Sequence, residues 1–264
     1  MRQWMTSGVA LCGLALATGA AAQGGTARRT TERVWIDVNA GVAIAAEDTF
    51  EIRVALERFA EPAELVARYT LPRAASFDAG AGVMVTPVLG IGLSFERTSD
   101  QHSAELRAHI PHPLFANAYA DDNAETGDVM RRSEGSVSVQ GMVVAARTHR
   151  LRLRVFGGPT WFRIEQDAVR DITYNQFYFV RSPTNIVELT GFQFDPVDGS
   201  GWGFHAGADA SLFFTRILGI GAFAKFSRGH VDLENTLATG FGGQETASVP
   251  AGGFRVGGGV RVKF

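Results

Sequence analysis

The sequence contains few of the residues on which several classes of protein depend. It has a single cysteine, Cys12, within a segment that we expect to be cleaved off, so neither disulfide bonds nor thiol chemistry is expected. Basic and acidic residues number 25 and 27, a balance that gives no support to nucleic-acid binding. Beyond the N-terminal segment there is no run of about 18 apolar residues, so no transmembrane helix is predicted.

The N-terminal residues have the pattern of an export signal. A basic residue near the start precedes an apolar stretch at positions 9–17, and three alanines at 20–22 provide the small side chains found before a cleavage point. We therefore predict a cleaved signal peptide over residues 1–22. A short periplasmic segment over residues 23–32 and a single β-barrel domain over residues 33–264 would follow it.

The end of the chain has a clear two-residue period. Apolar and polar or small side chains alternate from position 254 onwards, with Phe254, Val256, Gly258, Val260, Val262 and Phe264 on one face and Arg255, Gly257, Gly259, Arg261 and Lys263 on the other. This alternation predicts a β-strand with one apolar face. Because nothing follows the strand to cover that face, we expect it to contact lipid.

The same period recurs along the chain and predicts eight strands. Glycine is abundant, with 31 residues, and helix signals are scarce. Segments of about ten residues that alternate in this way are typical of membrane β-barrels. The predicted strands are residues 33–45, 76–86, 88–97, 134–146, 150–163, 202–214, 218–228 and 254–264.

The connections between these segments alternate in length. They run long, short, long, short, long, short, long, as expected for a barrel with tight periplasmic turns and long extracellular loops. Two further segments, 50–56 and 103–110, also look extended. If both crossed the membrane the barrel would have ten strands, but the turn at 147–149 would then face outward. We favour eight strands, with these two segments as β-ribbons above the membrane.

These features resemble the small outer-membrane β-barrel proteins of Gram-negative bacteria, the OmpA/OmpX/OmpW-like group. The resemblance implies an all-β, transmembrane, antiparallel up-and-down barrel in the bacterial outer membrane. It also implies that Val260, Val262 and Phe264 form the signal that the barrel-assembly machinery recognises. Outer-membrane lipid and lipopolysaccharide are the expected surroundings. The sequence gives no expectation of a peptidoglycan-anchoring domain after the barrel.

The predicted register directs both acids and bases into the lumen. An eight-stranded barrel is just wide enough for its own side chains, so these charges should neutralise one another. We expect a salt-bridged plug, with a gated ion path as the alternative. Inward glycines should make room for the long arginines. The predicted lumen charges are Asp37, Asp78, Glu96, Arg152, Arg154, Asp209, Lys225, Arg255 and Arg261.

Three loop features were weighed as sites. The set Asp100, His102, Ser103, His109 and His112 could supply an acid, a base and a nucleophile, but its spacing is not diagnostic and the prolines near His112 favour a rigid turn. The acidic stretch 121–128 resembles a calcium loop only loosely, and we predict a solvated loop tip. We expect the aromatics of the third long loop to pack in a β-ribbon, with a recognition surface as the alternative; they are Tyr174, Phe177, Tyr178, Phe179, Phe192 and Phe194.

The sequence therefore predicts a non-enzymatic outer-membrane barrel with a plugged lumen, acting through its loops in envelope structure or surface interaction with a ligand of unidentified chemistry. The first alternative is a narrow channel for ions or small amphipathic molecules. The second is an outer-membrane enzyme acting on lipid or peptide. Catalytic residues, cofactors and metal ions are not predicted.

Overall fold

The computed structural model describes residues 33–126, 130–235 and 245–264. The predicted signal peptide and periplasmic segment lie outside these ranges. Within them, no helix is long and apolar enough to cross a membrane. The elements are the strands β1 (Val34–Ala45), β2 (Thr49–Arg58), β3 (Glu61–Thr70), β4 (Ala74–Met84), β5 (Leu89–His102), β6 (Ala104–Pro111), β7 (Tyr119–Glu125), β8 (Met130–Arg147), β9 (Leu151–Tyr178), β10 (Asn185–Phe213), β11 (Leu218–Asn235) and β12 (Glu245–Lys263).

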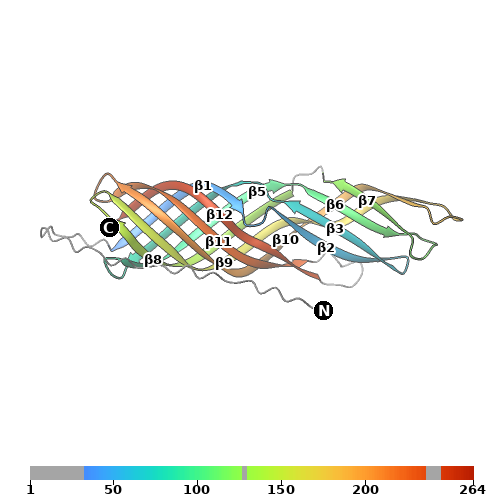
Figure 1. Cartoon of the computed structure of the whole chain (residues 1–264), viewed down its shortest axis with the longest axis horizontal. Helices are drawn as coiled ribbons and strands as arrows, with labels where there is room; N and C mark the ends of the chain where they lie inside the picture. The colour runs from blue at the N-terminus through green and yellow to red at the C-terminus, as the bar shows by residue number, and fades with distance from the viewer. Residues whose placement is uncertain (1–32, 127–129, 236–244) are drawn as a thin grey trace, which may run out of the picture. The chain divides into compact units, whose positions relative to one another are not determined.

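Eight of these strands close into a barrel (Figure 1). The ring runs β1-β12-β11-β10-β9-β8-β5-β4, all neighbours are antiparallel, and β4 pairs with β1 to complete it. The predicted eight-stranded barrel is thus confirmed. The ten-stranded alternative is wrong, because β2 and β6, which contain the two additional extended segments, belong to a separate four-stranded sheet of order β2-β3-β6-β7.

The barrel wall is apolar outside and polar inside. Along β9, Leu151, Leu153 and Val155 are exposed, whereas Arg152 and Arg154 between them are buried in the lumen. Each of the other strands of the ring contributes exposed apolar side chains to the same outer band. Members of this lipid-facing band include Val38, Val42, Phe77, Val83, Ile91, Leu93, Phe95, Val137, Val139, Val143, Phe204, Leu212, Ile220, Phe226, Phe254 and Val260.

Several strands extend well beyond their predicted ends. The segments expected at 150–163 and 202–214 are parts of β9 and β10, which pair as one long hairpin as far as Tyr178 and Asn185. Two strands were missed. The sequence does not predict β3, which opens with Glu61 and Pro62, two residue types that are depleted in strands. β7 contains most of the acidic stretch that was predicted to be a loop tip.

The four-stranded sheet and the upper parts of β9 to β12 share an apolar core, which is separate from the barrel lumen. We call this part the extracellular domain. Tyr69 is fully buried in it, its hydroxyl accepts a hydrogen bond from the backbone N–H of Val169 at 3.3 Å, and burial raises its pKa to about 12. Core members include Ile52, Leu65, Leu106, Ile110, Phe162, Ile164, Val231, Leu233 and Val249. The β-ribbons expected above the membrane are therefore parts of a packed domain.

Replacing Val260 by Arg tests the register of the wall. Val260 is 46% exposed on the lipid-facing side and pairs with Val38 and Ile220. An arginine there should lower the free energy of unfolding by about 2–4 kcal/mol if the residue lies near the membrane midplane. Urea unfolding of the protein in lipid vesicles would measure this. Thr70→Arg, on an exposed residue of β3, should change little; equal effects of the two substitutions would contradict the assignment.

Candidate functional site

The lumen is the candidate site, because it contains most of the buried charge of the barrel. All nine predicted lumen charges point inward, and eight of them are less than a tenth exposed, Asp78 being somewhat more open. They come from β1, β4, β5, β9, β10, β11 and β12. Eight of the nine fall into two clusters that lie at different levels of the barrel.

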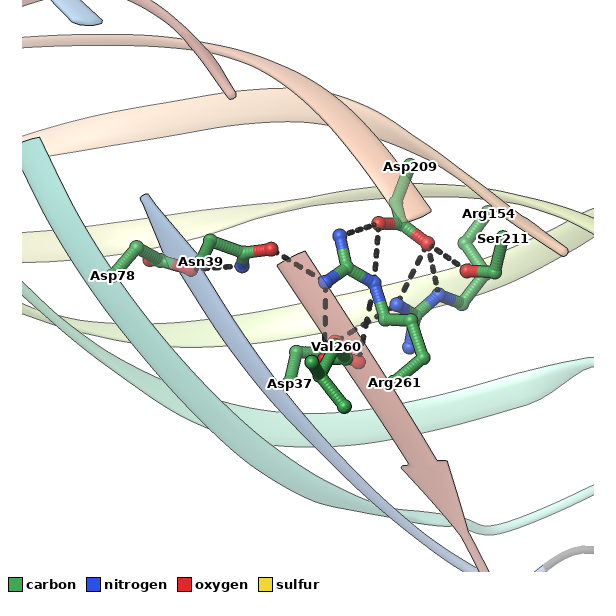
Figure 2. A network of polar contacts seen from close by, with 8 residues as sticks. All are labelled: Asp37, Asn39, Asp78, Arg154, Asp209, Ser211, Val260 and Arg261. Carbon is green, nitrogen blue, oxygen red and sulfur yellow. Dashed lines mark hydrogen bonds and ion pairs between the residues drawn. The ribbon is translucent and has the colours of Figure 1, made fainter. Parts of the chain in front are cut away.

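The lower cluster contains two acids and two bases (Figure 2). The Arg154 guanidinium donates to Asp209 at 2.7 Å and to Asp37 at 2.8 Å. Arg261 binds Asp209 through two nitrogens, one of them 2.9 Å from a carboxylate oxygen, and lies 3.4 Å from Asp37. The Ser211 hydroxyl donates a further hydrogen bond to Asp209 at 2.5 Å. Two acids opposed to two bases make this cluster neutral, and each charged group has two partners of opposite sign.

The upper cluster has Glu96 at its centre. Lys225 and Arg255 both form ion pairs with this carboxylate. Lys225 also lies 3.5 Å from Asp78, and Arg255 donates to Glu134 at 2.7 Å. Ionised carboxylates in contact with guanidinium and ammonium groups offset the cost of removing both from water.

Several members of this polar network are not among the nine predicted lumen charges. Arg132 lies 3.5 Å from Glu134 and donates to the Gln166 side chain at 2.9 Å, which completes a balance of three acids and three bases in the upper cluster. Asn39 joins the clusters, because its amide nitrogen donates to Asp78 at 2.7 Å and its oxygen accepts from Arg261. Arg132 and Glu134 lie in the same two-residue period as the inward residues of β8. Glu134 is the first residue of the predicted strand 134–146, and extending that strand by two residues would have included Arg132.

Aromatic rings flank the lower cluster. Arg154 lies over the Trp35 ring at 5.1 Å, and Arg152 and Lys263 lie over the Phe213 ring at 4.8 and 3.8 Å. Such contacts hold a cation by the negative face of the ring. Trp35 itself is buried in the lumen, with 2% of its surface exposed.

The inward glycines make room mainly for these aromatics. A Cβ at Gly82 or Gly92 would lie 2.6 Å from the Trp35 ring, and one at Gly207 would lie 2.7 Å from Phe156. The prediction that inward glycines make room for arginines applies at Gly221, where a Cβ would lie 2.8 Å from the Arg261 side chain. Glycine is needed at these points because any side chain would overlap the packed ring or guanidinium.

The distribution of polarity is the reverse of that in a water-soluble protein. The ring exposes a continuous apolar band and buries its charges, an arrangement that is stable only when lipid surrounds the band. The chain is a transmembrane β-barrel of the outer-membrane type. The resemblance stated from the sequence is thus confirmed at the level of the fold.

Known proteins offer only distant matches to this chain. No family model matches the sequence, and no curated protein matches it. Similar solved structures include Neisserial surface protein A (9% identity, 88% of this chain and 97% of that chain, TM-score 0.45), OprG from Pseudomonas aeruginosa (8%, 89% and 97%, 0.46) and the outer-membrane protease OmpT from Escherichia coli (10%, 89% and 98%, 0.49). At these values the likeness concerns the barrel alone and does not extend to activity.

The residues weighed as a catalytic set are not brought together. Asp100 and His102 lie inward on β5, with His102 Nδ1 3.6 Å from the carboxylate, while Ser103 points away from them. His109 is on the outer face of β6, 2.6 Å from Asp121. His112 lies in the turn after β6 and is buried, as is His102.

The acidic stretch is a strand rather than a loop. Residues 121–125 pair with β6, and the Asp122 carboxylate accepts a hydrogen bond from the Leu189 backbone N–H at 2.7 Å. Positions 127 and 128 lie outside the described residues. Within the described part of the chain, no three His, Cys, Asp or Glu side chains are grouped to hold a metal ion.

The aromatics of the third long loop divide between both expected roles. Tyr174, Phe192 and Phe194 pack against the core of the extracellular domain, as expected for a β-ribbon. Phe177 and Phe179 are 57% and 59% exposed at the end of the β9–β10 hairpin. These two residues are therefore available for surface contacts.

Removing the Asp209 carboxylate charge should be strongly destabilising. In Asp209→Asn, two buried guanidinium groups lose their shared partner, and we expect a loss of about 3–5 kcal/mol in the free energy of unfolding. The matched control is Asp198→Asn, since Asp198 pairs with Arg163 on the exposed surface and should contribute at most about 1 kcal/mol. Urea unfolding in lipid vesicles measures both. Similar small losses would mean that the lower cluster is hydrated and weak.

Proposed function

We propose that this protein is a non-enzymatic outer-membrane barrel with a charge-plugged lumen, and that it acts through its extracellular domain in envelope structure or surface interaction. The observation that carries this proposal is the charge balance of the lumen, with two acids facing two bases in one cluster and three facing three in the other. A permeating ion would have to separate buried pairs, at a cost of several kcal/mol for each.

Side-chain contacts connect the turns at the distal end of the extracellular domain. His112 Nδ1 accepts hydrogen bonds from the backbone N–H groups of Leu114 and Phe115 at 3.0 and 3.2 Å, and its ring lies edge-on to Tyr178 at 5.4 Å. These contacts join the β6–β7 turn to the β9–β10 hairpin. A rigid scaffold of this kind suits the display of a recognition surface.

The β2–β3 turn is connected to the β6–β7 turn as well. The Glu61 carboxylate accepts a hydrogen bond from the backbone N–H of Asn117 in the β6–β7 turn at 3.0 Å. Desolvation, together with this nearby negative charge, raises the pKa of Tyr119. All three turns carry exposed apolar side chains. These distal side chains are Phe59, Leu114, Phe177, Phe179 and Val180, with exposed fractions between 51% and 71%.

These apolar side chains favour a partner that binds at the distal end. Isolated exposed apolar residues are ordinary, but a group of them on three connected turns marks an interaction site. The chemistry of the surface ligand is left open by this proposal. The role of Val260, Val262 and Phe264 in recognition by the assembly machinery remains a prediction. Val260 is exposed on β12, and Phe264, the residue that follows this strand, is exposed as well.

Single-channel recording tests the plugged lumen. Protein refolded into a planar bilayer, with folding checked by heat-dependent gel mobility, should give no reproducible conductance steps because the clusters leave no continuous polar path. A porin added afterwards to the same bilayer confirms that insertion and recording work. Reproducible steps from the folded protein would favour the alternative of a narrow channel, and the small lumen hollow lined by Lys225 and Asp209 would then be part of its path.

The β2–β3 turn provides a test of the distal surface. Phe59 and Ala60 have φ of 53° and 60°, values that the two-residue turn requires and that Asn-Gly adopts far more readily. We expect Phe59→Asn with Ala60→Gly to stabilise the extracellular domain by about 1–3 kcal/mol, measured by resistance to proteolysis in urea. Asn117→Gly, at φ 58°, should gain less because asparagine already tolerates this region. A loss of stability in the double variant would mean that the Phe59 side chain packs against the domain and is not available to a partner.

A further inference from the structure

The described side chains at the periplasmic end of the barrel carry charge of one sign. The described residues at this end, 33–36, 83–91, 142–153, 212–219 and 261–264, include no Asp or Glu. Among the basic residues there, the exposed ones, which we call the basic rim, are Arg33, Arg147, Arg150 and Arg216. The opposite end of the barrel has both signs, and its exposed arginines form pairs such as Arg228 with Glu47 at 3.1 Å and Arg163 with Asp198 at 3.2 Å.

The basic rim lies at the edge of the lipid-facing band. Arg150 directly precedes Leu151, which is 49% exposed at the start of that band. Arg216 lies in a turn between Phe214 and Ile217, which are 58% and 49% exposed. Figure 1 shows this turn and the end of β12 at the same end of the barrel, and the backbone N–H of Lys263 donates to Ile217 at 3.0 Å.

This position places the guanidinium groups at headgroup depth. An arginine beside an exposed apolar residue lays its stem along the apolar surface and directs its charged end to the adjacent polar layer. At the boundary of a hydrocarbon band, that layer consists of lipid headgroups. Guanidinium groups bind phosphate oxygens with two parallel hydrogen bonds, and cations near an anionic lipid surface are attracted to it.

We propose that the basic rim binds the phosphate groups of anionic phospholipids in the leaflet that surrounds the periplasmic end of the barrel. The charge of the rim is complementary to any anion. Its continuity with the lipid-facing band favours a lipid headgroup over a soluble anion or a periplasmic protein. This inference depends on the transmembrane placement of the barrel but not on a plugged lumen or on the extracellular domain, so it stands or falls separately from the proposed function.

Electron paramagnetic resonance of spin-labelled lipids tests this proposal. The full-length protein is reconstituted in phosphatidylcholine vesicles that contain a trace of spin-labelled phosphatidylglycerol or of spin-labelled phosphatidylcholine. The immobilised fraction of each label measures how strongly that lipid associates with the barrel surface. We expect a severalfold preference for phosphatidylglycerol that weakens as salt is added, because the attraction between exposed charges is screened.

A charge-matched pair of variants assigns the preference to the rim. Arg33→Gln, Arg150→Gln and Arg216→Gln together should reduce the preference towards unity. Arg73→Gln, Arg97→Gln and Arg131→Gln remove the same charge from exposed positions at the other end and should retain it. Heat-dependent gel mobility confirms that each variant is folded, and Arg216→Gln alone, expected to lose part of the preference, covers the case in which the triple variant does not fold.

Three results would overturn the proposal. The first is equal association of the two lipids with the folded wild-type protein. The second is an equal loss of preference in both triple variants, which would point to net charge rather than to the rim. The third is a loss of the preference when glycerol phosphate is added but not when sodium chloride is added to the same ionic strength. The rim would then bind a soluble phosphate.

Discussion

The requirement that charges inside a narrow closed ring neutralise one another governs this structure. Every second residue of each barrel strand faces a lumen that is only wide enough for side chains, so an inward acid or base cannot keep a full hydration shell. Asp209 satisfies the requirement by contacting both Arg154 and Arg261, and Glu96 does so by contacting both Lys225 and Arg255. The bulky partners in turn need neighbouring positions without side chains, which glycine provides on the facing strands.

The same strands reverse their polarity where they leave the lipid. On β9 the inward residues change from Arg152 and Arg154 to Phe162 and Ile164, while the outward residues change from leucine and valine to Arg163 and Glu165. Lipid requires an apolar exterior and tolerates a polar, paired interior, whereas water outside favours an apolar core. One pair of antiparallel strands can therefore contribute to a membrane barrel and to a water-exposed domain without a break in hydrogen bonding.

This reversal explains what could be read from the sequence and what could not. Alternation identified the eight wall segments and the inward direction of residues such as Asp37 and Lys225, because period two fixes the face of every residue once the apolar side is assigned to lipid. It could not give the pairing of Arg154 with both Asp37 and Asp209, since partners from three strands depend on the ring's stagger. The strands above the membrane were cut short for a different reason, namely that the apolar residues change faces near Phe162.

The arrangement of the clusters also bears on whether the lumen could open. The hollow lined by Asp37, Asp78 and Lys225 lies between the two clusters, which leaves a cluster on either side of it. Within each cluster most charged side chains contact two partners of opposite sign. When one guanidinium moves away, the carboxylate it leaves is therefore still in contact with another base. If the lumen is plugged as proposed, exchange of partners within a cluster keeps it closed, and a path through it would require several buried pairs to separate at once, with their desolvation costs adding. A rigid plug supporting an external domain is the arrangement that these contacts favour.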